Sequence, residues 1–172
     1  MDSLLDSMFL KRFCLPSNIN IKDDEYTINK CLCGTSNHIA CIFKVKTSSN
    51  INKTRILNFG INIPENNNNK ILSPSIHAEH NVLLKLKTLN KNKNKKETIN
   101  LLVVRFSKTN KIQSSKPCSK CIKIMNIIPY KKGYKIKNIY YSNNDGNILR
   151  TTLSELTNDE NKHVTKFFRK IK

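Results

Sequence analysis

The chain has 172 residues, of which 38% are hydrophobic, enough for a single domain to bury a core without disulfide support. Lys and Arg number 31 against 12 Asp and Glu, so the net charge is +19. No apolar run approaches the ~20 residues that span a bilayer, and the start has early acids and no basic segment, which argues against a membrane partner and a secretory signal. We therefore expect a cytoplasmic or nuclear protein.

The positive charge has two competing explanations. A basic surface is typical of proteins that bind nucleic acid, because phosphates attract Lys and Arg. Lys, Asn and Ile are all abundant here, however, and all three have A/T-rich codons, so the composition would also suit an A/T-rich viral or protist genome. The sequence leaves both explanations open.

The predicted elements begin with a short amphipathic helix over residues 1–15. Residues 39–45 and 55–60 are rich in β-branched and aromatic side chains and flank a Ser/Asn turn, which predicts a hairpin of two strands. The asparagine run at 66–69 and the alternating Asn and Lys at 90–96 are too polar to pack, so we expect two surface loops there.

Helices and strands alternate along the rest of the chain. We expect, in order, a helix over 77–89, a buried strand over 99–106, a helix over 118–128 that ends before Pro129, strands over 136–141 and 147–152 separated by a turn at 144–146, and a basic C-terminal helix that starts at Asn158. This alternation is typical of a layered α/β domain. No linker divides the chain, so we expect one domain over residues 1–172.

Two short segments carry candidate metal ligands. Residues 77–79 read H-A-E, and residues 117–121 read P-C-S-K-C. Zinc prefers nitrogen and sulfur ligands, and a catalytic zinc site keeps three protein ligands. Cys118 and Cys121 are three residues apart, so both sulfurs can face one ion from the first turn of a helix. We therefore predict that His77, Cys118 and Cys121 bind one zinc ion per chain.

Glu79 is the candidate proton carrier. It follows His77 by two residues, which is too close for a comfortable fourth ligand but well placed for a water molecule on the ion. Zinc lowers the pKa of such a water to about 7, and Glu79 would move its proton. A C-x-x-C pair alone also fits a redox pair or half of a structural zinc site. The conjunction of H-x-E and P-C-x-x-C in this order favours a catalytic type of site.

A second zinc site is a weaker hypothesis. Cys31, Cys33, His38 and Cys41 form the pattern C-x-C-x4-H-x2-C. Cys41, however, lies inside a predicted strand whose alternation would bury it, and free cysteine is commonly a small core residue. We therefore favour the interpretation that Cys41 belongs to the core.

The chain resembles the cytidine/deoxycytidylate deaminase superfamily. The resemblance covers roughly residues 37–150 and is carried by the H-A-E and P-C-x-x-C segments together with Gly60-Ile61-Asn62, a G-x-N element after the second strand. It implies a three-layer sandwich with a mixed five-stranded sheet flanked by helices, and a zinc ion between two helix N-termini. It also implies that Asn62 contacts the substrate's sugar or base, that the Ala78 backbone touches the base edge, and that the chain forms a homo-oligomer.

Two features depart from the family pattern. The interval between the two motifs is longer than usual, partly because of the Asn/Lys tract, and Lys116 stands where many members carry Glu or Ser. Neither removes a metal ligand, but both bear on the substrate.

Three functions follow from the sequence. The first is a zinc-dependent hydrolytic deaminase of a cytosine nucleoside or nucleotide, with Glu79 as general acid/base. The second keeps this chemistry but acts on a base within RNA or single-stranded DNA, as the net charge favours. The third is a non-catalytic module of the same fold that zinc stabilises.

Overall fold

The structure, a computed structural model, describes residues 36–48, 51–63, 75–89, 96–107, 109 and 111–161. All of them belong to one compact unit, Thr35–Lys172. The helix expected over 1–15 and the asparagine run at 66–69 lie outside the described residues, as do residues 90–95 of the Asn/Lys tract and the tail beyond 161.

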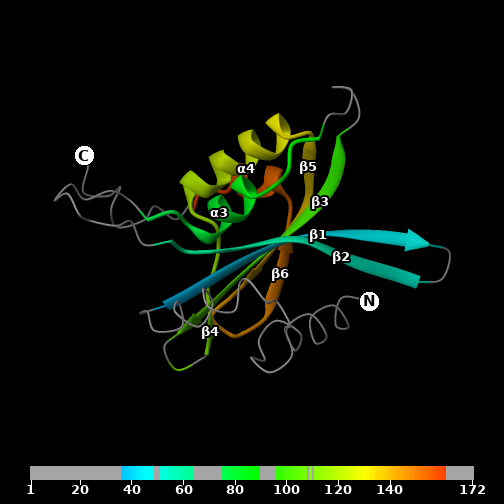
Figure 1. Ribbon diagram of the computed structural model, residues 1–172. Helices are drawn as coiled ribbons and strands as arrows, with labels where there is room; N and C mark the ends of the chain where they lie inside the picture. The colour runs from blue at the N-terminus through cyan, green and yellow to red at the C-terminus, as the bar shows by residue number, and fades with distance from the viewer. Residues whose placement is uncertain are drawn as a thin grey trace. The chain divides into compact units, whose positions relative to one another are not determined.

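The described residues form a mixed β-sheet with helices packed on it, as the sequence predicts for an α/β domain (Figure 1). Its strands are β1 (Ser36–Ser48), β2 (Ile51–Ile61), β3 (Glu97–Ser107), β4 (Ile112–Gln113), β5 (Tyr134–Ser142) and β6 (Ile148–Thr151). The order across the sheet is β2-β1-β3-β5-β6, with β4 paired to β3. Strands β3 and β5 are parallel, whereas the other pairs are antiparallel.

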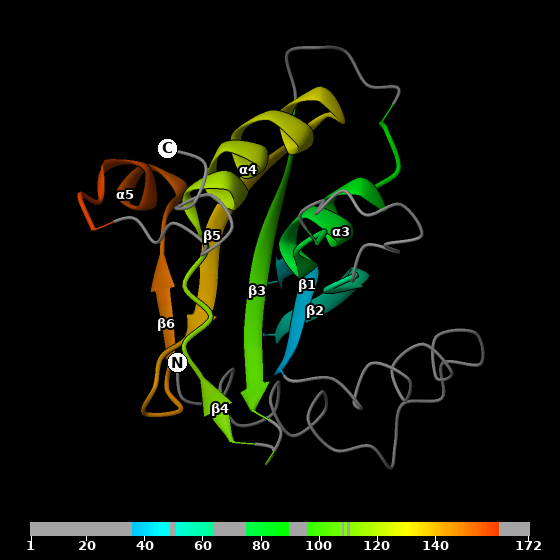
Figure 2. The same cartoon turned by 90° about the vertical axis from the view of Figure 1, so that its left-hand side faces the viewer.

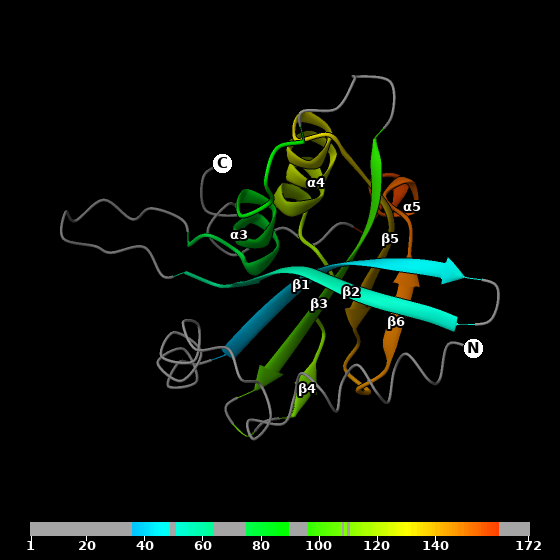
Figure 3. The same ribbon diagram turned by 45° about the vertical axis from the view of Figure 1, so that its right-hand side comes forward.

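The sheet has six strands, so the expected count of five is wrong. The additional strand, β4, lies beside the end of β3 (Figure 3). The chain reverses there through Ser107, whose N–H donates to the carbonyl of Lys111 and whose Oγ accepts the N–H groups of Thr109 and Lys111. A strand of two residues is too short to show the alternation by which strands are predicted.

Three helices are described: α3 (Ala78–Leu84), α4 (Ser119–Lys131) and α5 (Leu153–Asn158). Helices α3 and α4 lie side by side across one face of the sheet (Figure 2). Helix α3 contacts β1 and β2, while α4 contacts β5 and α5. The core between helices and sheet is made of buried apolar side chains from both layers, among them Ala40, Ile42, Val82, Leu101, Val103, Met125, Ile139 and Leu156.

Helix α3 ends at Leu84 and is shorter than the helix expected over 77–89, because backbone carbonyls at its end accept hydrogen bonds from the end of α4. The ammonium of Lys132 donates to the carbonyls of Leu84 and Leu86 at 2.5 and 2.6 Å, and the N–H of Leu89 donates to the carbonyl of Lys132. Leu86, which lies beyond the end of α3, is still buried.

Helix α4 continues through Pro129, which was expected to end it. Proline inside a helix removes one backbone hydrogen bond. Here Pro129 is fully buried and lies in the last turn, and the Lys132 N–H still reaches the carbonyls of Ile128 and Pro129. Burial of the ring against the core offsets the single lost bond.

A short helix, α5, ends at Asn158, whereas the helix expected to start at Asn158 falls mostly on residues beyond 161, outside the described residues. Thr152 caps α5: its side chain accepts the Glu155 N–H, and the Glu155 carboxylate accepts the Thr152 N–H in return. This T-x-x-E pattern is a sequence signature of a helix start. It was visible in the sequence and was missed.

Candidate metal centre

The segment that carries His77 returns alongside the end of β2. Ile63 and Ile76 form an isolated antiparallel bridge, with N–H to carbonyl distances of 2.9 and 3.1 Å. Just before the bridge, the Asn62 Oδ1 accepts the N–H of Ala78 at 2.7 Å. Asn62 thereby satisfies one of the backbone donors that a helix start leaves unpaired. His77 occupies the N-cap position of α3.

Gly60 allows α3 to lie this close to β2. A Cβ at position 60 would meet the Ala78 carbonyl oxygen and the Val82 nitrogen, both at 2.5 Å, and the Val82 Cβ at 2.8 Å. All three distances are shorter than van der Waals contact. The absence of a side chain at Gly60 therefore fixes the spacing between the sheet and the helix that begins after His77.

A buried serine network holds the segment that leads to α4. The Ser115 hydroxyl donates to the Val103 carbonyl at 2.8 Å and accepts the Ser142 N–H at 2.8 Å, so it ties the segment to both β3 and β5. Pro117 is fully buried, and Cys118 is the N-cap of α4. Cys121 follows in the first turn of this helix.

Lys116 forms an ion pair at the end of α5. Its ammonium lies 2.5 Å from the Asp159 carboxylate. The residue immediately before Pro117 therefore links the ligand-bearing segment to the end of α5.

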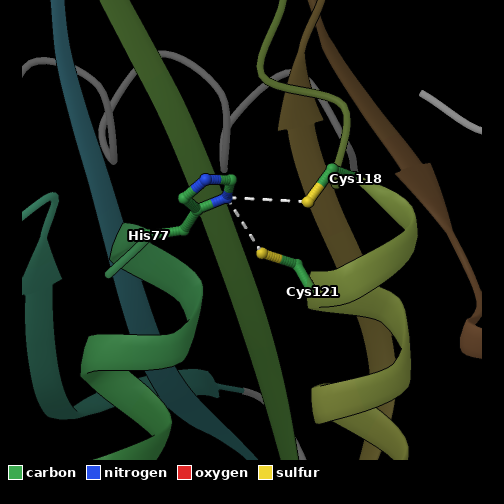
Figure 4. A group of neighbouring side chains, drawn as sticks. All are labelled: His77, Cys118 and Cys121. Atoms are coloured by element: carbon green, nitrogen blue, oxygen red, sulfur yellow. Dashed lines mark hydrogen bonds between the residues drawn. The ribbon is translucent and has the colours of Figure 1, made fainter. Parts of the chain in front are cut away.

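These two helix starts bring His77, Cys118 and Cys121 together (Figure 4). The His77 Nδ1 lies 3.6 Å from the Cys118 sulfur and 3.3 Å from the Cys121 sulfur. The three ligand atoms all lie within 4.8 Å of one another, close enough to hold one metal ion. No other such group of His, Cys, Asp or Glu occurs among the described residues.

The two thiols share protons with each other and with the imidazole. The hydrogen bond from Cys121, aided by His77, lowers the pKa of Cys118 to about 4 despite its burial. The pKa of Cys121 is raised, because its thiol donates to the Cys118 sulfur and because it is buried. The same Cys118 sulfur raises the pKa of His77 through a hydrogen bond. A site that stabilises thiolate character is the environment in which a metal ion binds.

Glu79 is buried beside these ligands. The residue is 4% exposed, and burial raises the pKa of its carboxyl group. The carboxyl group is hydrogen-bonded to Cys121, but its Oε2 is buried without a hydrogen-bond partner. A buried carboxylate oxygen without a partner is costly, which indicates that something absent from the protein chain fills this place.

Asn62 and Ala78, the predicted substrate contacts, both lie at the start of α3, where they are hydrogen-bonded to each other. The side-chain Oδ1 of Asn62 and the backbone N–H of Ala78 are both used in their mutual hydrogen bond. Their contacts with a substrate stay predictions.

His38 and Arg105 are neighbours of the centre that the sequence analysis did not assign to it. The pKa of His38 is lowered to about 4, first by burial and then by the charges of Arg105 and His77, and the charge of Cys118 acts on it as well. The two residues pair across β1 and β3. Their proximity depends on the register between two strands about 65 residues apart, and local sequence patterns do not reveal that register.

The hypothesis of a second zinc site fails on geometry. His38 and Cys41 are three residues apart in β1, so their side chains leave opposite faces of the sheet and cannot bind one ion together. Cys41 is a free, buried thiol, and burial raises its pKa to about 12. It is a core residue, whereas Cys31 and Cys33 lie outside the described residues.

A comparison of the chain with protein-family models, curated proteins and solved structures finds no match. Among the described residues, no helix is both long and apolar enough to cross a membrane.

Proposed function

We propose that this chain is a zinc-dependent hydrolytic deaminase of a cytosine nucleoside or nucleotide, built on a cytidine-deaminase-like three-layer fold. One observation carries the proposal: an imidazole nitrogen and two sulfurs gather within 4.8 Å, and a buried glutamate with an unpartnered oxygen stands beside them. One nitrogen and two sulfur donors suit zinc and leave one coordination position for a small molecule. The H-x-E and P-C-x-x-C segments supply these residues in the order found in zinc deaminases.

The chemistry divides between the metal and the chain. Zinc, when bound to His77, Cys118 and Cys121, would act as a Lewis acid that makes a water molecule nucleophilic near neutral pH. Glu79 takes a proton from the attacking water and delivers it to a ring nitrogen of the base, and then carries a second proton to the departing amine. A C–O bond forms at the amino-bearing carbon, its C–N bond breaks, and ammonia leaves with a uracil product.

Burial of Glu79 serves this chemistry. A carboxylate screened from bulk solvent exchanges protons with the substrate and not with the medium. The unpartnered Oε2 is the atom free to handle the proton.

The test is Glu79→Gln in the zinc-loaded protein. General acid/base catalysis contributes about a hundredfold to ten-thousandfold, so ammonia release from cytidine or dCMP should fall by at least about a hundredfold, while one zinc stays bound per chain. Glu160→Gln, which changes an exposed carboxylate, is the matched control and should leave the rate unchanged. Full turnover in Glu79→Gln contradicts the mechanism, and loss of zinc from it would make Glu79 a ligand.

A base within RNA or single-stranded DNA is the second candidate substrate, because the net charge of +19 favours contact with a polyanion. Deamination of an embedded cytosine, with binding that weakens steeply with salt, would favour it. Absence of ammonia release from every such substrate, with zinc bound, would favour the non-catalytic module instead.

A further inference from the structure

A row of polar residues crosses the sheet where its apolar core ends. His38 on β1 pairs with Arg105 on β3, and Arg105 pairs with Gln113 on β4. Because Ile39 pairs with Ile61, the next position along places Asn62 beside His38. We call Asn62, His38, Arg105 and Gln113 the polar row.

His38 and Arg105 project from the face of the sheet that the helices cover. Ala40 on β1 and Val103 on β3 are core residues on that face, and side chains two positions apart in a strand share a face. Strand β3 passes behind His77 in Figure 4, and the charges of His77 and Cys118 both act on His38. The polar row therefore lies on the sheet next to the metal centre, beyond the part that α3 and α4 fill with apolar side chains.

Arg105 carries a charge that the described residues do not balance. Its Nε is buried without a hydrogen-bond partner, and no described carboxylate forms an ion pair with it. The four residues of the polar row contain no acid. Arg105 is half-buried, and a buried guanidinium N–H without an acceptor is costly, so a hydrogen-bonding group from outside the chain is expected beside it.

His38 adds a second donor without adding charge. Its pKa of about 4 keeps the imidazole neutral at pH 7, so one of its ring nitrogens carries a hydrogen to donate. Arg105 thus supplies the positive charge, and His38 a neutral hydrogen-bond donor beside it.

We propose that Arg105 and His38 form a subsite for a phosphate group of the substrate, next to the metal ligands. The guanidinium presents a planar fork of N–H donors that matches the oxygens of a phosphate group. A neutral sugar hydroxyl would not balance the positive charge of Arg105. This inference rests on the proposed function and narrows it: the substrate is a phosphate-bearing nucleotide and not a free nucleoside. The phosphate belongs either to a mononucleotide or to the backbone of a single strand.

The test compares ligands that differ only in the phosphate. Uridine and UMP, a product pair that the reaction does not consume, are titrated calorimetrically into zinc-loaded wild type. A hydrogen-bonded charge pair contributes about ten- to a hundredfold in affinity, so UMP should bind tighter than uridine by that factor. Arg105→Met should abolish the preference and leave uridine binding and zinc content unchanged.

Two further variants distinguish phosphate binding at this subsite from a general effect of the protein's positive charge. Arg150→Met removes the same charge from an exposed position on β6 and should keep the full preference for UMP. Arg105→Lys keeps the charge but lacks the fork, so it should retain only part of the preference, and it also serves if Arg105→Met does not fold. A uracil-containing oligonucleotide without terminal phosphates, bound better than UMP in an Arg105-dependent way, would assign the subsite to a strand backbone.

The subsite and the reaction can fail separately. If wild type and both Arg105 variants prefer UMP equally, or if none prefers UMP and no oligonucleotide binds in an Arg105-dependent way, the phosphate subsite is overturned, whereas ammonia release from a cytosine substrate would still support the deaminase. If no cytosine substrate releases ammonia but the UMP preference depends on Arg105, the deaminase proposal is overturned and the phosphate subsite stands.

Discussion

At the scale of single residues, the metal centre consists of groups whose neighbours set their protonation. Cys118 is held near the thiolate state by donors from Cys121 and His77, while Glu79 is buried with one oxygen unpaired. His38 stands beside them as a neutral imidazole. Each of these groups differs from its state in water, which is characteristic of functional sites.

His38 makes stability depend on pH. Its pKa is about 4 in the folded protein against 6.5 in the unfolded chain, so between these values only the unfolded chain binds the proton. The free energy of unfolding therefore rises with pH through this window. The contribution of His38 to stability is complete above pH 6.5 and is lost as pH falls toward 4. The shift corresponds to at most roughly 3 kcal/mol.

Urea unfolding of zinc-loaded wild type and His38→Asn at pH 7.5, 6 and 5 measures this contribution. The stability advantage of wild type should shrink as pH falls, because only wild type has this imidazole to protonate on unfolding. Zinc release acts on both proteins and cancels in the difference. A difference that stays constant with pH would show that His38 titrates normally in the folded protein.

At the scale of elements, the close approach between β2 and α3 positions the metal ligand His77. Gly60→Ala should push α3 away from the sheet, since its Cβ would lie 2.5 Å from the Ala78 carbonyl oxygen. We expect a loss of about 1–3 kcal/mol in unfolding free energy, together with at least a tenfold weaker zinc affinity as His77 moves from the cysteines.

Gly146→Ala is the control for Gly60→Ala. Gly146 has φ of 85° in the turn between β5 and β6, and open space surrounds the place of its Cβ. The variant should lose about 1 kcal/mol from backbone strain and keep full zinc affinity. Equal effects of both variants on zinc affinity would remove the special importance of Gly60.

Thr152 should stabilise α5 through its reciprocal hydrogen bonds with Glu155. Thr152→Ala removes the cap and should cost about 1 kcal/mol in chemical unfolding. Ser154→Ala, an exposed change in the same helix, should stay within about 0.5 kcal/mol of wild type. A cost in Thr152→Ala no larger than in Ser154→Ala would show that the helix does not depend on its cap.

The same elements show what the sequence could predict. The β1–β2 hairpin, the strands β3 and β5 and the start of α4 follow from local patterns, because each buries a regular run of apolar side chains. The end of α3 depends on Lys132, and the persistence of α4 on the burial of Pro129, which are tertiary contacts. The ligands His77, Cys118 and Cys121 were found from motif chemistry, whereas Arg105 is revealed only by strand register.

At the scale of the whole molecule, the metal centre joins parts of the chain that are far apart in sequence. His77 and Cys118 are separated by 41 positions, and the segments that carry them are anchored to β2 on one side and to β3 and β5 on the other. An ion held by both helix starts would bind the folded chain and not the unfolded one. Its binding free energy is therefore added to the stability of the fold.

Zinc should raise the unfolding free energy in proportion to the logarithm of its concentration, by about 4 kcal/mol at a thousand times the dissociation constant. Urea unfolding with buffered zinc measures this slope, and metal analysis of the folded protein should give one zinc per chain. Cys121→Ser should abolish the slope, because it removes a ligand. Cys41→Ala is the matched change: it loses packing in the core but should keep the slope, since Cys41 faces away from the ligands. A slope that survives Cys121→Ser would place the stabilising zinc elsewhere and contradict the assignment of the centre.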